Sequence, residues 1–394
     1  MRLASVGAMI ALALMLSAGV LRAAELKLTV DWPGVTLDET FPVTGGIPFA
    51  RGALKSPGNV KLLSEGKAIL VQAKVLAVWP DKSVKWLLLD FQAKPSQKEF
   101  TLEYGDGVRG PEVDPLMFMQ QTDALVTVNT GAVSFTVRKD GGGFIDAVSF
   151  GEKKLFDSTG KRLNVFDFIH TEEPADYHPM NAIIREGFDD PSKVVVDAVT
   201  LEKPGPLHAV VRIDGRYTFQ NVGSTIEGTD VKGDCPFRVR IHAFAGKSYL
   251  KVEHFFIYEG DGDHDFAKTL ALKVGLPAGE GRIRVIGEDV KTLDGPLAGL
   301  YQETADAYTV WTSQGKAARV ASTGRRFDGV LDVIRGDVGV AVGIKDFWKT
   351  PAKSLHADLN AGLVSINLWA PEAPPLDFRR HAREWSVGET GTPN

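Results

Sequence analysis

The sequence has a single cysteine, Cys235, among 394 residues. One thiol can form neither an internal disulfide nor a cysteine-based zinc site, so burial of apolar side chains must hold the fold together. Cys235 precedes Pro236 at the start of an alternating segment, which favours a small buried residue over a nucleophile. Basic runs are also absent, and the net charge is −5. We therefore expect no nucleic-acid partner.

Long apolar runs are missing except near the start of the chain. There Arg2 precedes an apolar run of 14 residues, from Ala8 to Leu21, which is followed by the small residues Ala23 and Ala24. The run is shorter than the ~20 residues that span a membrane, and the pattern is typical of a secretory signal. We predict a signal peptide at residues 1–23, a periplasmic or secreted protein, and no membrane partner after cleavage.

Amphipathic helices of three turns are absent after this leader. Apolar residues instead alternate with period two, as in Phe237, Val239 and Ile241, and again from Leu250 through Val252, His254 and Phe256. Turn-forming residues separate such runs at residues 129–131, 335–337 and 360–362, which predicts hairpins there. The fold class expected is all-β.

Gly and Pro interrupt the alternation near residues 105–115, where we place a domain boundary. Residues 25–110 have the size of a small β-barrel, in which Trp79 and Trp86 are expected to fill the interior. Residues 120–375 suit a large antiparallel two-sheet β-sandwich. Residues 371–375 are rich in proline, and residues 376–394 read as a linker-like tail or, alternatively, as a frayed terminus.

Two sequence blocks carry a specific resemblance. Residues 41–54 read FPVTGGIPFARGAL, and residues 77–87 read AVWPDKSVKWL. Together they resemble the N-terminal RIFT-type barrel of the exo-rhamnogalacturonan lyase and YetA-like family of polysaccharide lyases. Residues 129–132, 205–215 and 346–349 are similar to the central β-sandwich of that family.

The resemblance implies a carbon–oxygen lyase. Family members usually continue into a helical α/α toroid, which we expect to be absent here, together with half of the substrate cleft. The expected function is action on, or binding of, an acidic rhamnose-containing polysaccharide of the rhamnogalacturonan or ulvan type, by β-elimination if the chain is active. The alternatives are a noncatalytic periplasmic carbohydrate-binding accessory protein and a truncated, inactive lyase.

A uronate lyase needs a group that neutralises the substrate carboxylate, a base and an acid. Residues 161–188 are rich in such groups and show little alternation. We predict His170, Tyr177, His178 and Arg185 as catalytic residues, although surface loops are commonly polar without catalytic function.

Three cationic or titratable residues, Arg238, Arg240 and His242, alternate on one strand opposite its apolar positions. We predict that Arg238, Arg240 and His254 line a substrate-binding cleft. The alternative is an outer face with acidic cross-strand partners, and for His254 a place in the core. The tryptophans Trp311, Trp348 and Trp369 could stack on sugars or anchor the sandwich.

Cofactor motifs in the sequence context they require are absent. The sequence has no GxxxxGK[ST], HExxH or GxSxG pattern. Its GxGxxG spacing at residues 105–110 (GDGVRG) is followed by Pro111 and opens no helical pattern, so nucleotide use, zincin chemistry and α/β-hydrolase chemistry all lack support. We expect no cofactor and no metal. The run of acids from Glu259 to Asp265 could bind calcium but lacks the spacing of an EF-hand, so a solvated turn is the favoured interpretation.

Overall fold

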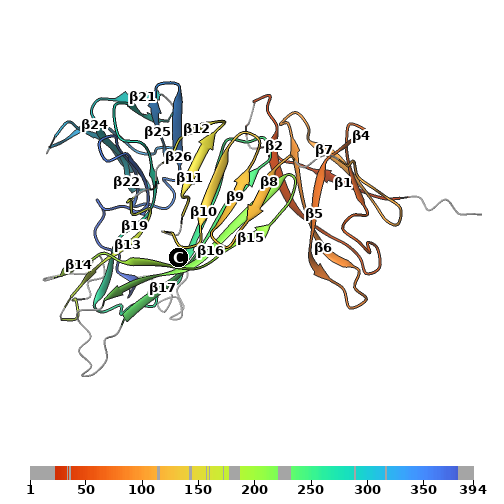
Figure 1. Ribbon diagram of the computed structural model, residues 1–394, viewed down its shortest axis with the longest axis horizontal. Helices are drawn as coiled ribbons and strands as arrows, with labels where there is room; N and C mark the ends of the chain where they lie inside the picture. Colours follow the sequence, from red (N-terminus) through yellow and green to blue (C-terminus); the bar gives the residue numbers. More distant parts are fainter. Residues whose placement is uncertain are drawn as a thin grey trace, which may run out of the picture. The chain divides into compact units, whose positions relative to one another are not determined.

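The computed structural model describes residues 23–32, 34, 37–112, 116–141, 144–156, 158, 160–171, 173–176, 187–220, 232–287, 290–315 and 317–379. The chain divides into two compact units, Met1–Asp114 and Pro115–Asn394. Almost all regular structure in both units is β-strand (Figure 1), as expected for the fold class. No helix in the described ranges has the length and apolarity needed to cross a membrane.

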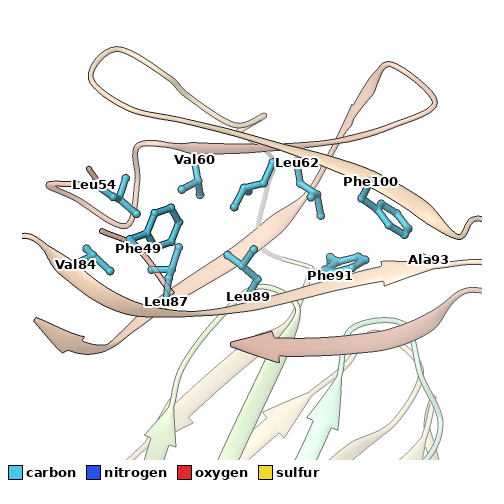
Figure 2. Close-up of a cluster of buried hydrophobic side chains, with 11 residues drawn as sticks. Phe49, Leu54, Val60, Leu62, Val84, Leu87, Leu89, Phe91, Ala93 and Phe100 are labelled. Atoms are coloured by element: carbon cyan, nitrogen blue, oxygen red, sulfur yellow. The ribbon is translucent and has the colours of Figure 1, made fainter. Parts of the chain in front are cut away.

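The first unit is built from two antiparallel sheets. One contains, in spatial order, β1 (Ala24–Thr29), β7 (Glu99–Tyr104), β3 (Val60–Ser64) and β4 (Lys67–Ile69); the other contains β2 (Phe41–Pro48), β6 (Val84–Ala93) and β5 (Val71–Val78). Figure 2 shows the buried core that these strands share. Leu87, Leu89 and Phe91 alternate on β6 and point into it, because successive side chains of a strand face opposite sides.

The two tryptophans near the β5–β6 turn do not fill this core together. The same alternation that buries Leu87 places Trp86 on the opposite side of β6, where it is 41% exposed. Trp79 is half-buried, and its Nε1–H donates a hydrogen bond to the carbonyl oxygen of Phe49 at 3.0 Å. The expectation that Trp86 fills the barrel was therefore wrong, whereas Trp79 fixes the turn to a neighbouring loop.

The second unit contains four antiparallel sheets. The five-stranded sheet contains, in spatial order, β12 (Lys153–Lys154), β11 (Ala147–Phe150), β10 (Ser134–Arg138), β9 (Leu125–Asn129) and β8 (Phe118–Gln121). The eight-stranded sheet contains β14 (Phe188–Asp190), β13 (Asn164–His170), β19 (Asp265–Gly275), β28 (Leu363–Trp369), β27 (Lys353–Asp358), β22 (Leu297–Thr304), β23 (Ala307–Ser313) and β24 (Ala318–Gly324). Of the two four-stranded sheets, one contains β15 (Lys193–Lys203), β16 (His208–Gln220), β17 (Lys232–Phe244) and β18 (Leu250–Phe256), and the other contains β21 (Val290–Leu293), β20 (Arg282–Ile286), β25 (Val330–Arg335) and β26 (Val338–Gly343).

The three predicted hairpins are confirmed. Residues 129–131 join β9 to β10, residues 335–337 join β25 to β26, and residues 360–362 join β27 to β28. Gly362 has a φ of 60° and lies so close to the Leu276 carbonyl that an added Cβ would be 2.2 Å from its oxygen. Only glycine meets both conditions at this turn.

Aromatic side chains join the four-stranded sheet β15–β18 to the eight-stranded sheet in a sandwich. Phe166 of β13 packs edge-on against Tyr217 of β16 with ring centroids 5.3 Å apart, and against Phe256 of β18 at 4.9 Å. Phe168 stacks on Phe219 at 4.2 Å. Burial of each such ring contributes roughly 1.5–3 kcal/mol, so this apolar layer is the main cohesion between the two sheets.

The segment after β28 is packed onto the sandwich as far as Arg379. Leu376 forms a β-bridge with Ala267, and the ring of Phe378 stacks on Tyr258 with centroids 3.8 Å apart. The Arg379 guanidinium bonds to Asp377 and to the carbonyl of Ala175. The first residues of the predicted tail are thus part of the folded unit, while residues 380–394 lie outside the described ranges.

Candidate functional site

The outer face of the four-stranded sheet β15–β18 carries most of the candidate binding residues. Strands β16 and β17 pair so that Asp214 lies opposite Arg238 and Arg212 opposite Arg240. The residues between them, such as Ile213 and Val239, are fully buried on the inner face. Alternation alone therefore separates a charged outer face from an apolar inner face.

Ion pairs connect the charged side chains into one chain, which we call the arginine face: Glu202, Arg212, Asp214, Arg238 and Arg240. Arg238 Nε donates to Asp214 Oδ1 at 2.6 Å, and Arg212 Nε donates to Asp214 Oδ2 at 2.7 Å. Arg240 donates to Glu202 through Nε at 2.6 Å and Nη2 at 3.1 Å. The five side chains comprise three guanidinium groups and two carboxylates, and Glu253 lies directly opposite Arg240 on β18.

The arginines of this face are positioned but not used up. The contacts of Arg238 among described residues involve Nε alone, and its side chain is 43% exposed. Its two terminal amino groups can therefore donate to an incoming anion. The hydrogen bonds to Glu202 raise the pKa of Arg240, against the opposing effect of burial, so this guanidinium stays charged.

An apolar edge borders the arginine face. Phe255 lies opposite Arg238 in the pairing of β17 with β18 and is 60% exposed. Ile257, which donates its backbone N–H to the Pro236 carbonyl at 2.8 Å, is 48% exposed. A large exposed ring next to arginines offers a surface on which the apolar side of a flat or cyclic ligand can stack.

A row of titratable side chains crosses the four strands beyond the arginines. Lys203 Nζ lies 3.0 Å from His208 Nδ1, and His208 Nε2 lies 2.9 Å from His242 Nδ1. His242 Nε2 is 3.3 Å from Glu253 Oε2. Burial lowers the pKa of His242, and the Glu253 carboxylate only partly opposes this effect. His242, which alternates with the arginines as predicted, is thus bound into a local network.

His254 lies on the opposite face of the sheet. It pairs with Val239, and its Nε2 is 2.7 Å from the hydroxyl oxygen of Tyr217, whose O–H donates to Asn164. Burial lowers the pKa of His254 to about 4, so the ring is neutral at pH 7. The structure therefore brings Arg238 and Arg240 together but does not bring His254 to them.

His170 is fully buried and clamped by two carboxylates. Its Nδ1 lies 2.5 Å from Asp265 Oδ1, and its Nε2 lies 2.9 Å from Asp190 Oδ2. Burial lowers the pKa of His170, but the two carboxylates outweigh it and raise the pKa overall. Both ring nitrogens are engaged in joining β13 to β14 and β19. The other predicted catalytic residues, Tyr177, His178 and Arg185, lie outside the described residues.

The remaining chemical candidates have local partners. Cys235 is fully buried, and burial raises its pKa to about 12. In the acidic run, Asp261 accepts a hydrogen bond from the backbone of Asp263, and Asp265 accepts one from the backbone of Asp261. Within the described ranges, no group of three or more His, Cys, Asp or Glu side chains is arranged to hold a metal ion.

Sequence reasoning missed Glu202, Asp214 and Phe255. The two acids are recognisable only when the pairing of three strands is known. Phe255 had a local signal, because it lies between His254 and Phe256, two positions of the apolar face, and must therefore point to the charged side.

Comparison with known proteins identifies the class of this fold. The family model described as PcRGLX-like protein central beta sandwich domain matches residues 117–287 and 299–389, and the PcRGLX-like N-terminal RIFT barrel domain matches residues 27–105. The chain belongs to the PcRGLX-like family, which is rhamnogalacturonan lyase-like, and the resemblance seen in the sequence is confirmed.

One relative is the uncharacterized protein YetA of Bacillus subtilis (strain 168). It is 26% identical to this chain over 250 residues, which cover 63% of this chain. The same match covers 27% of YetA, so the chain spans about a quarter of the length of that relative.

Proposed function

We propose that the protein binds an acidic, rhamnose-containing polysaccharide of the rhamnogalacturonan or ulvan type through the arginine face. Membership in a rhamnogalacturonan lyase-like family supports the polysaccharide class. The observation that carries the proposal is the row of three guanidinium groups on one sheet face, each held by Asp214 or Glu202.

The ion pairs prepare this face for binding. A free arginine side chain loses conformational freedom when it grips a ligand, and a carboxylate that already holds Nε reduces that loss. Guanidinium groups recognise carboxylates through paired, charge-assisted N–H donors. Arg238 would donate its terminal amino groups to a uronate carboxylate, while Phe255 stacks on an adjacent sugar ring.

Titration calorimetry with rhamnogalacturonan oligosaccharides tests this proposal. Arg238→Ala and Arg240→Ala should each weaken binding about tenfold, a loss of ~1.4 kcal/mol. Arg319→Ala, which removes an exposed arginine of β24, is the matched control and should bind as the wild type does. Equal binding by all three variants would refute the proposal, as would undiminished affinity for oligosaccharides whose carboxylates have been reduced to alcohols.

β-Elimination is the second candidate function, and the lyase-like family favours it. His170, with both ring nitrogens engaged, would position β13 and β14, while Tyr177, His178 and Arg185 remain the proposed acid, base and carboxylate-neutralising groups. A lyase forms an unsaturated uronate that absorbs ultraviolet light. Growth of that absorbance on rhamnogalacturonan or ulvan would establish catalysis, and saturable binding without it would establish the noncatalytic accessory function.

We also propose that the protein is exported to the periplasm or beyond. The apolar leader and the small residues at Ala23 and Ala24 support this proposal. Mass spectrometry of the protein isolated from cell fractions should find a mature N-terminus near residue 24 outside the cytoplasm. An intact Met1 on cytoplasmic protein would contradict it.

A further inference from the structure

We propose that the outer face of the eight-stranded sheet binds a neutral pyranose. The site, which we call the aromatic face, comprises Tyr301, Trp311, His356, Trp369 and Glu372. The proposal deepens the proposed function, and rests on it for the saccharide class, but it uses a different sheet and different residues.

Strand pairing gathers these side chains. Gly299 of β22 lies opposite Trp311 of β23 and opposite His356 of β27, and Tyr301 lies opposite Ser354. These positions share one side of the sheet, because directly opposed residues in antiparallel strands point the same way. The intervening residues form the sandwich core on the other side: Ala298, Leu300, Val310, Leu355 and Ala357.

Gly299 lets two rings lie against the sheet. A Cβ added there would be 2.5 Å from Cζ2 of Trp311 and 2.8 Å from Cδ2 of His356, so both rings occupy the space above the glycine backbone. The ring centroids are 5.2 Å apart with planes at 68°. An indole that rests on the backbone by one side keeps its other face for a ligand, and the half-buried state of Trp311 is consistent with this.

Glu372 brings a fixed carboxylate to the rings. Its Oε1 accepts a hydrogen bond from His356 Nε2 at 2.6 Å, and its Oε2 accepts one from Ser354 Oγ at 3.0 Å. Ser354 is held in turn by the Asn367 amide at 2.8 Å. Trp369 Nε1–H donates to the Pro374 carbonyl at 3.2 Å, which fastens the segment that carries Glu372.

The charge of this site selects its ligand. Burial raises the pKa of Glu372, but the hydrogen bond and charge of His356 outweigh this effect and lower it. A carboxylate that stays charged accepts hydrogen bonds from sugar hydroxyls, and the five residues of this site include no guanidinium group to pair with a uronate. The C–H side of a pyranose stacks on an indole face while its hydroxyls reach the carboxylate. The aromatic face therefore suits a neutral sugar, whereas the arginine face suits an acidic one.

Nuclear magnetic resonance titration of the full chain tests the site, with methyl α-L-rhamnopyranoside as the probe. The wild type should bind it weakly, with a Kd in the range of ~1–10 mM. Trp311→Ala and Glu372→Gln should each weaken binding at least about tenfold. Trp348→Ala is the control, because the Trp348 indole stacks instead under Arg326 at 4.2 Å.

The outcomes separate this site from the arginine face. Loss of probe binding in the Trp311 and Glu372 variants, with Arg238→Ala unaffected, supports the aromatic face even if uronate binding fails. Circular dichroism and thermal unfolding establish that each variant is folded, and Trp311→Phe, which keeps a ring, should bind the probe between the two extremes. An absence of saturable shifts in the wild type overturns the proposal, as does unchanged binding in both variants. Tighter binding of choline than of the sugar would also overturn it, because the aromatic face would then be a site for a quaternary ammonium cation.

Discussion

The two faces of the sheet β15–β18 use polar residues in opposite ways. On the inner face, His254 and Tyr217 share a buried hydrogen bond and pack among phenylalanines of β13 and β18. On the outer face, Arg238 and Arg240 are ion-paired yet reach solvent. Alternate residues of a strand point to opposite faces of the sheet, so a polar side chain either stabilises the core or is available to bind a ligand, depending on the face to which it points. Substitutions on the inner side should change stability, and substitutions on the outer side should change binding.

The largest loss of stability is expected where the apolar layer between the sheets contains a buried charge. Asp265→Ala leaves the His170 imidazolium buried with Asp190 as its remaining carboxylate partner. Loss of one partner from a buried ion pair lowers the free energy of unfolding by about 3–5 kcal/mol. Urea denaturation measures this loss. Asp189→Ala, which removes an exposed carboxylate paired with Lys268, is the control and should change stability by less than about 1 kcal/mol. Similar values for both variants would contradict a stabilising clamp.

The next effect is a pH dependence from His254. Its pKa is about 4 in the folded protein, below the ordinary value of 6.5. The unfolded chain therefore binds a proton between these values while the folded chain does not, and stability falls as the pH falls from 6.5 towards 4. The loss amounts to at most about 3 kcal/mol. His254→Gln should show a flatter stability profile between about pH 7 and about pH 5. Parallel profiles would show that His254 is not buried in the neutral form.

The smallest stability effect is expected on the outer face. Arg238→Ala removes a partly exposed ion pair, which contributes ~0–1 kcal/mol, and this contribution should shrink further at high salt. Thermal unfolding in low and high sodium chloride measures it. The same variant should bind acidic oligosaccharide about tenfold more weakly, a loss of ~1.4 kcal/mol, so its binding defect would exceed its stability defect. A stability loss as large as that of Asp265→Ala would remove the distinction between the two faces.

Local alternation predicted the strands, the hairpins and the buried side of β17 and β18, whereas Trp86 was expected on the buried side of its strand and lies on the other side. Alternation placed Arg238 and Arg240 on the face opposite Val239, and the structure confirms that arrangement. Alternation also groups His254 with Val252 and Phe256, and the structure places all three on the face opposite the arginines. His170 and Asp265 are 95 residues apart, so no local pattern indicates their contact.

The aromatic face illustrates the same limit. Trp311 and Trp369 stood out in the sequence as residues that could stack on sugars, but Gly299 and Glu372 gave no signal of their own. Glycine at position 299 matters only because two rings from neighbouring strands fill the space it leaves. The fit between a glycine and the rings of neighbouring strands exists only once the sheet has formed, so the sequence of a single strand does not predict it.

The contact between Arg379 and Ala175 joins positions 204 residues apart. Folds dominated by contacts between distant residues form slowly, because the chain loses much entropy before those contacts stabilise it. The sandwich completes this contact only when Arg379 is in place, whereas the core of the first unit closes without it. We therefore expect the sandwich to fold after the first unit and to depend until then on chaperones that shield its unpaired strand edges.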